Sequence, residues 1–564
     1  MDTIIRIDMA ELKVTTEKTP PDFQLLGGRG LSARILNAEV SALAHPLGEE
    51  NKLVVAPGLL AGTMAPSFGR ISFGSKSPLT ETIKESNAGG TAAQKLDRLG
   101  IKAIIVQGKP KDDQPYIVSI DSKGAQLLPA PDLSGKMNYE LASILQNKYG
   151  KDIGVIALGP AGEAKMTAST IAVTDQDGRP SRHAGRGGLG AVMGSKRIKA
   201  IVVNAEGTKA IEPLDRELFK ETVRDLIEIL KQDKGAQSFS KFGTPGGIKF
   251  LRELGSMPSW NYHGGPVEGI ENIYGDTIAQ VNQSRGGRMH GCMPGCVVQC
   301  SIVFHADDGK HTTSALEYET LAMLGTNLGI TNLDAIAKMD RMCDDMGVDT
   351  IEVGSAIAQV MEAGGIQFAD QQKVLAILKG LREGAPLGRI VGQGAAFTAH
   401  YFGLDRVPTS KGQAIPAHDP RACKAVGVTY CVSPMGADHT AGIDYRDSFS
   451  KEGQVKRSRD AQVLNAAIDS VGYCFLAMPT KGKLMYEFLA KLLNARYGTD
   501  LEVEDVMNMG INTIKEELDF NRLAGWADVQ NRLPEFLMKE KLPPHNEVFD
   551  ISQDEIDAIF EDVN

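Results

Sequence analysis

The sequence predicts an α+β protein with a β-rich N-terminal domain over residues 1–205 and two mainly α-helical domains over 206–405 and 406–564. Its length of 564 residues corresponds to two to four domains at about 150 residues each. Short apolar runs broken by Gly and Pro fill the first part of the chain, and helical periodicity dominates the rest. These observations define the predicted architecture.

The apolar runs of the first 205 residues are short and bounded by turn-forming residues, which is typical of strands. They lie at 54–55, 103–106, 117–120, 153–158 and 200–203. Helical periodicity is sparse in this part, so we expect a mainly β N-terminal domain.

Apolar residues recur every three or four positions in many segments after residue 206, which predicts amphipathic helices. These segments are 213–231, 317–325, 334–346, 351–363, 370–382, 461–477, 484–497 and 503–518. The pattern changes from strand-like to helical near residue 205 and changes less distinctly near residue 405. We expect the domain boundaries at these two positions.

Charge and hydropathy exclude two classes of partner. The chain has 61 Lys and Arg against 71 Asp and Glu, a net charge of −10, with no strongly basic segment. Nucleic acid is therefore not an expected partner. No apolar run approaches the roughly 18 residues of a membrane helix, so no membrane insertion is expected. The first twelve residues lack the apolar core of a signal peptide, so we expect a cytoplasmic location.

Three of the seven cysteines, Cys292, Cys296 and Cys300, fall within nine residues, which indicates a metal site in a cytoplasmic protein. Pro294 and Gly295 disfavour a helix through the first gap, so we expect a loop there and a helical turn in the second gap. An iron–sulfur cubane needs four thiolates, and Cys474 is the best candidate for the fourth. A structural zinc site and a set of buried core cysteines remain alternatives.

Two short motifs resemble each other, one in each helical block. Residues 344–349 have the form DxxGxD, and residues 469–474 have the form DxxGxC. Because helices often end in Gly, both motifs fit ordinary helix C-caps. They equally fit two equivalent grips on a two-fold ligand, since an Asp carboxylate accepts two parallel N–H bonds.

Two glycine-rich stretches, 65–90 and 182–194, combine small residues with arginines, as anion-binding loops do. Gly185, Gly187 and Gly190 spell the dinucleotide-binding pattern, but no strand is expected directly before Gly185 and no crossover helix fits after it. The two stretches therefore favour another phosphate-bearing ligand, with plain turns between strands as the alternative.

Taken in order, these segments resemble the aldehyde ferredoxin oxidoreductase family of tungsten–pterin enzymes along essentially the whole chain. The matching segments are SKSPLT with ESNAGG (75–90), AGRGGLGAVMGSK (184–196), EYET (317–320), CDDMGVDT (343–350), DSVGYC (469–474), LDFNRLAGW (518–526) and RLPEFL (532–537). The cysteine spacing differs from the family's usual CxxCxxxC, because the first gap here holds three residues.

The resemblance implies an N-terminal base for a tungsten (or molybdenum) bis-pyranopterin, a Mg²⁺ ion between the pterin phosphates and a nearby [4Fe–4S] cluster. It assigns phosphate and magnesium contacts to Arg70, Asn87, Gly89, Arg182, His183 (through its backbone), Gly185 and Arg186. It gives one pterin to Asp344 and Asp349 and the other to Asp469, with main-chain contacts from Val348 and Tyr473. It gives the cluster to Cys292, Cys296, Cys300 and Cys474.

For the chemistry, the resemblance implies a Glu and a His near the metal. Glu319 is the favoured carboxylate, with Glu317 a close second, and His439 is the favoured imidazole. Such groups suit aldehyde oxidation, which must release protons while the metal takes two electrons. Judged without the family, an ordinary role is favoured for both residues, a solvated helix residue for Glu319 and a satisfied buried histidine for His439.

The resulting hypothesis is oxidation of aldehydes to carboxylic acids, with electrons passed through the cluster to ferredoxin or an iron–sulfur partner subunit. The alternatives are a low-potential reductase subunit of the same family, of the aromatic acyl-CoA type, and a non-catalytic iron–sulfur or zinc scaffold. A homodimer or a hetero-oligomer is compatible with the sequence. Some family members bridge their dimer with an iron, and Lys338 stands at the position of its Glu ligand, so no such bridge is expected.

Overall fold

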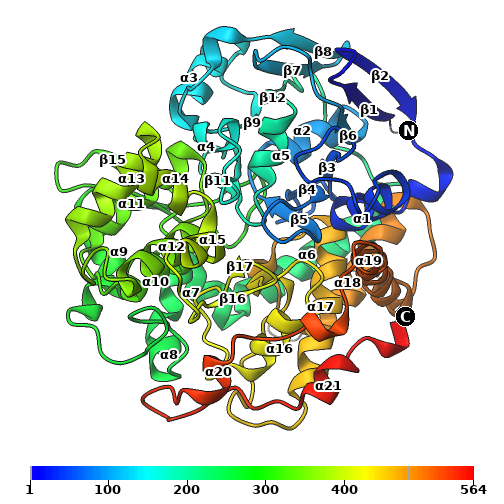
Figure 1. Cartoon of the computed structure of the whole chain (residues 1–564). Helices are drawn as coiled ribbons and strands as arrows, with labels where there is room; N and C mark the ends of the chain where they lie inside the picture. The colour runs from blue at the N-terminus through cyan, green and yellow to red at the C-terminus, as the bar shows by residue number, and fades with distance from the viewer. Residues whose placement is uncertain (1–2, 480–481, 564) are drawn as a thin grey trace.

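The computed structural model describes residues 3–479 and 482–563. Figure 1 shows two sheets in the blue and cyan half of the molecule and a predominantly helical half, green to red, against them. The predicted fold class is confirmed. No helix among the described residues is long and apolar enough to cross a membrane.

The first sheet has six strands in the order β2-β1-β6-β3-β4-β5. Only β1 and β6 pair in parallel, and the other neighbours are antiparallel. The strands are β1 (Thr3–Asp8), β2 (Lys13–Lys18), β3 (Leu53–Pro57), β4 (Ile71–Lys76), β5 (Ile83–Ala88) and β6 (Ile101–Gln107).

The second sheet repeats this topology strand for strand, in the order β8-β7-β12-β9-β10-β11, again with one parallel pair, β7 and β12. Its strands are β7 (Tyr116–Asp121), β8 (Gly124–Pro129), β9 (Gly154–Ala157), β10 (Ile171–Val173), β11 (Arg182–Ala184) and β12 (Ile198–Val203). All five predicted strands are present.

The sheets pack on a shared apolar core, to which β1, β3, β4 and β6 contribute from one side and β7, β9, β10 and β12 from the other. Helix α1 (Gly28–Glu39) covers the far face of the first sheet, and α3 (Asn138–Tyr149) covers that of the second. The N-terminal part is sheet-rich, as predicted, and it also contains helices that the sequence did not indicate. Helix α1 escaped prediction because eight of its twelve residues are buried, which removes the amphipathic pattern.

The helical half contains every predicted helix, with shifted ends. The main ones are α6 (Arg216–Gln232), α10 (Tyr318–Met323), α11 (Leu333–Met346), α12 (Thr350–Glu362), α13 (Gln371–Glu383), α16 (Lys424–Val432), α17 (Gln454–Val471), α18 (Gly482–Tyr497) and α19 (Val503–Leu523). Helix α17 ends before Cys474, which therefore lies in a loop. The division of this half near residue 405 stays a prediction.

Two glycine contacts join the helical half to the sheets. Helices α11 and α17 each end at a left-handed glycine, Gly347 (φ 74°) and Gly472 (φ 82°). Each meets a glycine that follows a strand of one sheet: a Cβ built on Gly58 would lie 2.2 Å from Gly472 Cα, and one on Gly159 would lie 2.2 Å from the Met346 carbonyl oxygen. The two DxxG motifs are therefore C-caps, and they are also equivalent joints between helix and sheet.

Replacing Gly58 with alanine tests the first joint. Because the added methyl would meet backbone rather than a movable side chain, we expect the free energy of unfolding to fall by about 1–3 kcal/mol, measured by chemical denaturation. Gly247→Ala is the matched control, since its Cβ would make an ordinary 3.7 Å contact with Leu251. Equal stability of the two variants would contradict the close packing at this joint.

Candidate cofactor and active site

We call the carboxylates of Asp469 and Asp344, one from each DxxG motif, the two Asp grips. The first, Asp469, lies at the end of α17. Asp469 Oδ1 accepts a hydrogen bond of 3.1 Å from Asn87 Nδ2, and its Oδ2 lies 3.4 Å from Arg29 Nη1. Arg70 in turn donates to the side chain and the carbonyl of Asn87. Burial raises the pKa of Asp469 to about 6, against the opposing effects of Arg29 and Arg70. Glu85, beside them, has its pKa raised to about 8 by burial and by Asp469.

The second Asp grip has an equivalent surrounding at the end of α11. Asn87 stands opposite Ser72 in the β4–β5 pair, and His183 stands opposite Ala172 in the corresponding β10–β11 pair. His183 Nε2 lies 3.3 Å from Asp344 Oδ1. Burial, with Asp340 adding to it, raises the pKa of Asp344 well above its usual range. The two sheets thus present Asn87 and His183 to the two carboxylates in the same way.

The region between the grips contains buried polar atoms that lack a hydrogen-bond partner among the described residues. They include Asp344 Oδ2, His183 Nε2, Arg182 Nε, Glu85 Oε1 and His439 Nδ1. A buried polar group without a partner costs about 1–3 kcal/mol. Donors and acceptors of this kind, together with two equivalent carboxylates, fit a ligand made of two like heterocycles with N–H edges.

The clustered cysteines lie in the connection between β13 (Arg288–His290) and β14 (Ser301–His305), which pair antiparallel. The connection contains no helix, so the expected helical turn in the second gap is wrong. The first gap is a loop, as predicted, with Gly295 at a φ of 75°. Glutamine side chains hold this loop through its carbonyls: Gln94 at Pro294 and Gln176 at Gly291.

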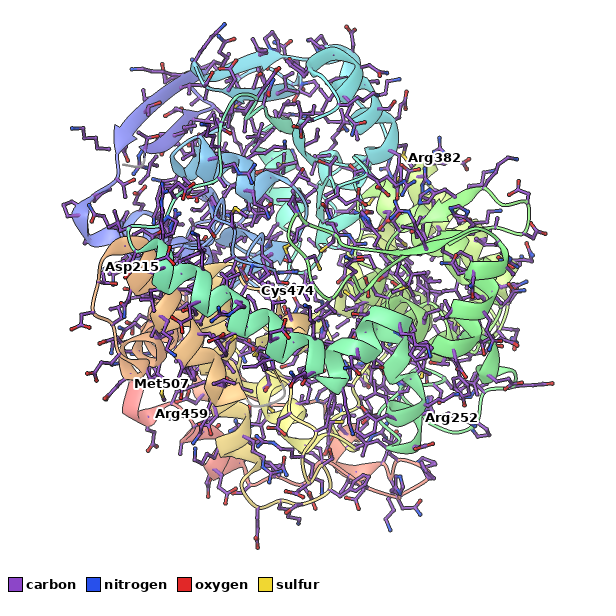
Figure 2. All side chains as sticks on the ribbon, turned by 180° about the vertical axis from the view of Figure 1, so that it is seen from behind. Asp215, Arg252, Arg382, Arg459, Cys474 and Met507 are labelled. Carbon is purple, nitrogen blue, oxygen red and sulfur yellow. The ribbon has the colours of Figure 1, made fainter. Side chains whose placement is uncertain are left out.

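Residue Ser67 brings Cys474 to this loop. Its backbone N–H donates to the Gly295 carbonyl (3.1 Å), and its carbonyl accepts from Cys474 N–H (3.0 Å). In Figure 2, Cys474 lies near the middle of the molecule beside α6, which follows Asp215. Apolar residues of α6 and α18 surround all four cysteines.

The four thiols influence one another electrostatically. A hydrogen bond from Cys296 and the charge of nearby arginines lower the pKa of Cys292 to about 6, while the same bond raises the pKa of Cys296. Burial raises the pKa of Cys300 and Cys474, and the charge of Cys292 adds to the effect on each. No group of three or more His, Cys, Asp or Glu among the described residues could hold a single metal ion.

The charges of Arg182 and Arg70 reach the cysteine loop, because both guanidinium groups lower the pKa of Cys292. Arg182 also donates to Ser301 Oγ (3.0 Å) and to the Ser314 carbonyl (2.6 Å). Together with burial, it lowers the pKa of His183 to about 4. Gly89 has a packing role here, since a Cβ on it would lie 2.8 Å from Cys292 Sγ.

The glycine-rich segment after β11 mostly packs against protein. A Cβ would clash at Gly187, Gly188 and Gly190 but would meet nothing within 4 Å at Gly185. Strand β11 runs directly into Gly185, contrary to the expected loop, but its pairing is antiparallel, so no dinucleotide-binding βαβ unit results. Arg186 points into the protein, where it lies 3.2 Å from Asp349 Oδ2 and donates to the Ala414 carbonyl.

The structure separates the two candidate carboxylates of the EYET segment. Glu317 is the N-cap residue of α10; its side chain accepts a hydrogen bond from Thr244 Oγ1 (2.6 Å) and lies 3.6 Å from Arg182 Nη1. Glu319 instead faces two imidazoles: its Oε1 is 3.1 Å from His418 Nε2 and 3.8 Å from His439 Nε2. This geometry favours Glu319 over Glu317 as the acid–base group.

The protonation states of this trio follow from burial and charge. Burial disfavours the Glu319 carboxylate, but His439 and His418 outweigh burial and hold its pKa at about 2. Burial lowers the pKa of His439, against the charge of Glu319. His418 was missed from the sequence, because only the fold brings residue 418 beside residue 319.

The remaining predicted residues have structural contacts of their own. Asp349 caps α12 by accepting from Ile351 N–H (3.0 Å), and burial raises its pKa. Val348 donates its N–H to the Cys343 carbonyl beside the Gly347 cap. The Tyr473 ring lies 4.5 Å from that of Phe68, above the cysteine loop. These positions place all three at the joints between helix and sheet.

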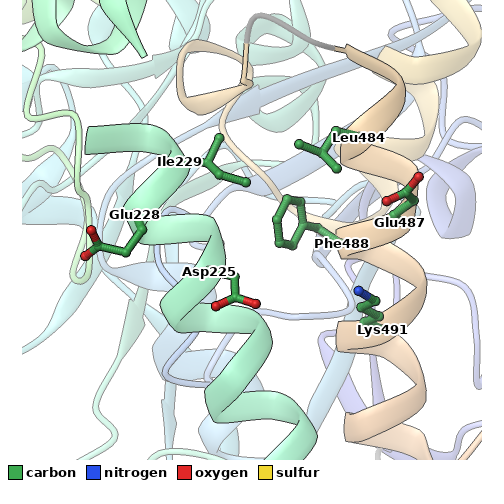
Figure 3. A pocket seen from close by; sticks show the side chains of 7 residues that line it. All are labelled: Asp225, Glu228, Ile229, Leu484, Glu487, Phe488 and Lys491. Carbon is green, nitrogen blue, oxygen red and sulfur yellow. The ribbon is translucent and has the colours of Figure 1, made fainter. Parts of the chain in front are cut away.

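Two surface pockets lie elsewhere. The first, of about 360 Å³, is set between α6 and α18 (Figure 3) and is lined by Asp225, Glu228, Ile229, Leu484, Glu487, Phe488 and Lys491. The second, of about 440 Å³, runs along α6 beside Met64. Neither is lined by a predicted site residue, so neither contributes to the site.

Family models cover almost the whole chain. One described as "Aldehyde ferredoxin oxidoreductase, N-terminal domain" matches residues 4–205, and one described as "Aldehyde ferredoxin oxidoreductase, domains 2 & 3" matches 221–561. The chain belongs to the aldehyde ferredoxin oxidoreductase family. The predicted family is thus confirmed, and the protein is an oxidoreductase.

Relatives of this aldehyde ferredoxin oxidoreductase family member include a tungsten enzyme. It is 31% identical to a tungsten-containing aldehyde ferredoxin oxidoreductase of Pyrococcus abyssi, over 96% of this chain and 92% of the relative. It is 26% identical to an "Aliphatic sulfonate oxidoreductase, WOR-like subunit" of Pyrococcus furiosus, over 90% and 83%. The family implies a tungsten–pterin cofactor and, typically, a [4Fe–4S] cluster.

A solved structure shares the fold of this family member. The "Active site complex BamBC of Benzoyl Coenzyme A reductase" superposes with a TM-score of 0.84 over 100% of this chain and 94% of that chain, at 18% identity. At this identity the likeness shows the arrangement of elements.

Replacing Cys474 with serine tests its place in the cysteine set. Since the loop contact through Ser67 does not involve the thiol, we expect an intact fold by circular dichroism and a lower iron content by elemental analysis. Cys423→Ser is the control, because that buried thiol contacts Ser256 Oγ outside the set. Wild-type iron in Cys474→Ser would remove Cys474 from the ligands.

Proposed function

We propose that this protein oxidises aldehydes to carboxylic acids on a tungsten–bispterin cofactor and passes the electrons through a [4Fe–4S] cluster to ferredoxin or to an iron–sulfur partner subunit. The observation that carries the proposal is the Glu319 carboxylate, whose side chain is only 13% exposed and which lies between two imidazoles. The overall reaction, RCHO + H₂O → RCOO⁻ + 3H⁺ + 2e⁻, needs such acid–base groups.

The residues present fit this cofactor set. Asp469 with Asn87 would hold one pterin, and Asp344 with His183 the other, since the two carboxylates are only 13% and 8% exposed and have equivalent partners on the two sheets. Arg70 and Arg182 would neutralise phosphates, with open backbone space at Gly185. Mg²⁺ between the phosphates is part of the proposal. Cys292, Cys296, Cys300 and Cys474 would hold the cluster.

When bound, the tungsten cofactor supplies the two-electron oxidant. The protein's own part is the movement of protons. Glu319 stays ionised at neutral pH because its pKa is about 2, so it orients and transfers protons without retaining them. Imidazoles at 3.1 and 3.8 Å can receive them. Asp438, hydrogen-bonded at 2.6 Å to the buried Lys84, fixes the loop that carries His439.

Activity assays identify the electron-transfer partner and the substrate. The sulfonate-oxidoreductase relative is named as a subunit, which supports a search for a partner chain. The reductase alternative has the fold of the benzoyl-CoA reductase complex in its favour. Anaerobically purified protein should reduce ferredoxin or a viologen dye with short aldehydes. Activity with an aromatic acyl-CoA and a low-potential donor, without aldehyde turnover, would favour the alternative.

The variant Glu319→Gln tests the acid–base role. Removing the carboxylate charge while keeping the side-chain shape should reduce kcat by about 10²–10⁴-fold with unchanged tungsten content. Glu317→Gln is the matched control two residues away, and we expect a much smaller loss. Wild-type turnover in Glu319→Gln, or a larger loss in Glu317→Gln, would overturn the assignment.

A further inference from the structure

Glu319, His418 and Tyr445 form a series of neighbouring polar side chains that leads from the site toward the protein surface. His418 Nε2 lies 3.1 Å from Glu319 Oε1, and His418 Nδ1 lies 3.0 Å from the Tyr445 hydroxyl oxygen. The His418 side chain is 5% exposed, whereas Tyr445 is half-buried. The Tyr445 ring packs edge-on against Phe250, which is 51% exposed. The series therefore runs from the Glu319 carboxylate, whose side chain is 13% exposed, to a partly exposed tyrosine.

The surrounding backbone fixes the inner half of this series. Tyr262 donates its hydroxyl to the carbonyls of Ile415 and Pro416, which precede His418. Tyr318 donates to the Ala417 carbonyl, and Ala417 N–H donates to Glu319 Oε2 (2.9 Å). These backbone hydrogen bonds hold the His418 ring between Glu319 and Tyr445. Each ring nitrogen faces one of these two groups.

The two histidines beside Glu319 face different surroundings. His439 Nδ1 has no hydrogen-bond partner among the described residues and lies 4.0 Å from Asp438, which pairs with buried Lys84. The His439 side chain is 19% exposed, against 5% for His418. Each ring nitrogen of His418 faces a polar group, Glu319 at Nε2 and Tyr445 at Nδ1, which makes it the imidazole that connects the carboxylate to Tyr445.

We propose that His418 and Tyr445 form the proton exit of the active site, carrying protons from Glu319 to solvent. The inference rests on the proposed function, which supplies the oxidation that releases the protons and takes up the electrons. A proton on Glu319 passes to His418 Nε2, His418 releases its Nδ1 proton to the Tyr445 hydroxyl, and that hydroxyl releases its own proton to water. Each group returns to its starting state after reorientation, so atoms and charge balance.

The charges around the series agree with outward transfer. Glu319, with its pKa of about 2, does not keep a proton at neutral pH and yields it to an imidazole. The other titratable groups that face His418 include His439 and Tyr318, whose rings lie 5.6 and 5.2 Å from the His418 ring. Burial raises the pKa of Tyr445 well above its usual range, so its hydroxyl stays protonated and serves as a hydrogen-bonded link.

The experiment uses the holoenzyme with Tyr445→Phe, which removes the hydroxyl and keeps the ring. We expect kcat to fall by about 10²-fold with little change in KM, and the loss to be reversed by rising concentrations of a small buffer base such as imidazole. Tyr274→Phe is the matched control, because its hydroxyl contacts Arg252 on the same surface but lies outside the series. Wild-type kcat in Tyr445→Phe, or a loss that buffer does not rescue, would overturn the proposal.

A second readout is independent of turnover. In holoenzyme labelled with ¹⁵N-histidine, with the His418 signals identified by their loss in His418→Gln, we expect Tyr445→Phe to shift the Nδ1 signal and Glu319→Gln to shift the Nε2 signal. Unshifted signals would contradict the series. If the wild-type protein turns over no aldehyde, the proposed function fails, and this spectroscopic test still decides whether the series exists.

Discussion

The backbone contact between Gly472 and Gly58, and its equivalent between Met346–Gly347 and Gly159, determines how the helical half sits on the sheets. In both, a helix ends at a left-handed glycine that packs against a glycine just past the end of a strand, and a Cβ on the latter glycine would lie 2.2 Å from the backbone of the helix end. Hydrogen bonds from Thr170 N–H to Gly347 and from Arg70 N–H to Gly472 close the joints. Since Asp344 and Asp469 each lie three residues before their glycine, the joints also place the carboxylates.

The duplication of the sheet explains why these carboxylates meet equivalent partners. Two sheets of identical topology offer Asn87 and His183 at the same register position, and both sheets share one core. A protein built this way suits a ligand with two like halves. Burial raises the pKa values of Asp344, Asp469 and Glu85. The neighbouring hydrogen-bond donors of the protein therefore do not fully offset the loss of water around these carboxylates.

Much of this arrangement could be predicted from sequence, and the failures have physical causes. The buried strands were found because their apolar runs are bounded by turn residues, whereas α1 was not, because burial on most sides removes helical periodicity. The turn expected between Cys296 and Cys300 fails because the connection joins two paired strands and has no helical segment. Spacing identified the cysteine group, and motif similarity identified Glu319.

Contacts between distant residues set the limit of sequence reasoning. Residues 418 and 445 carry no motif of their own, and only the packing of three aromatic hydroxyls around residues 415–418 brings His418 to Glu319. The same holds for the choice between Glu317 and Glu319, which are two residues apart but face Arg182 and His418 respectively. The sequence motif contains both glutamates, and only their neighbours in the fold distinguish Glu319 from Glu317.

The central claim is that two equivalent Asp grips and one cysteine set hold a bispterin and a cluster. The most direct test is the pterin, tungsten and iron content of protein purified without oxygen. The account predicts about two pterins, about one tungsten (or molybdenum) and about four iron per chain. Protein from a host shown to make the cofactor that contains zinc but neither pterin nor tungsten nor molybdenum would contradict it.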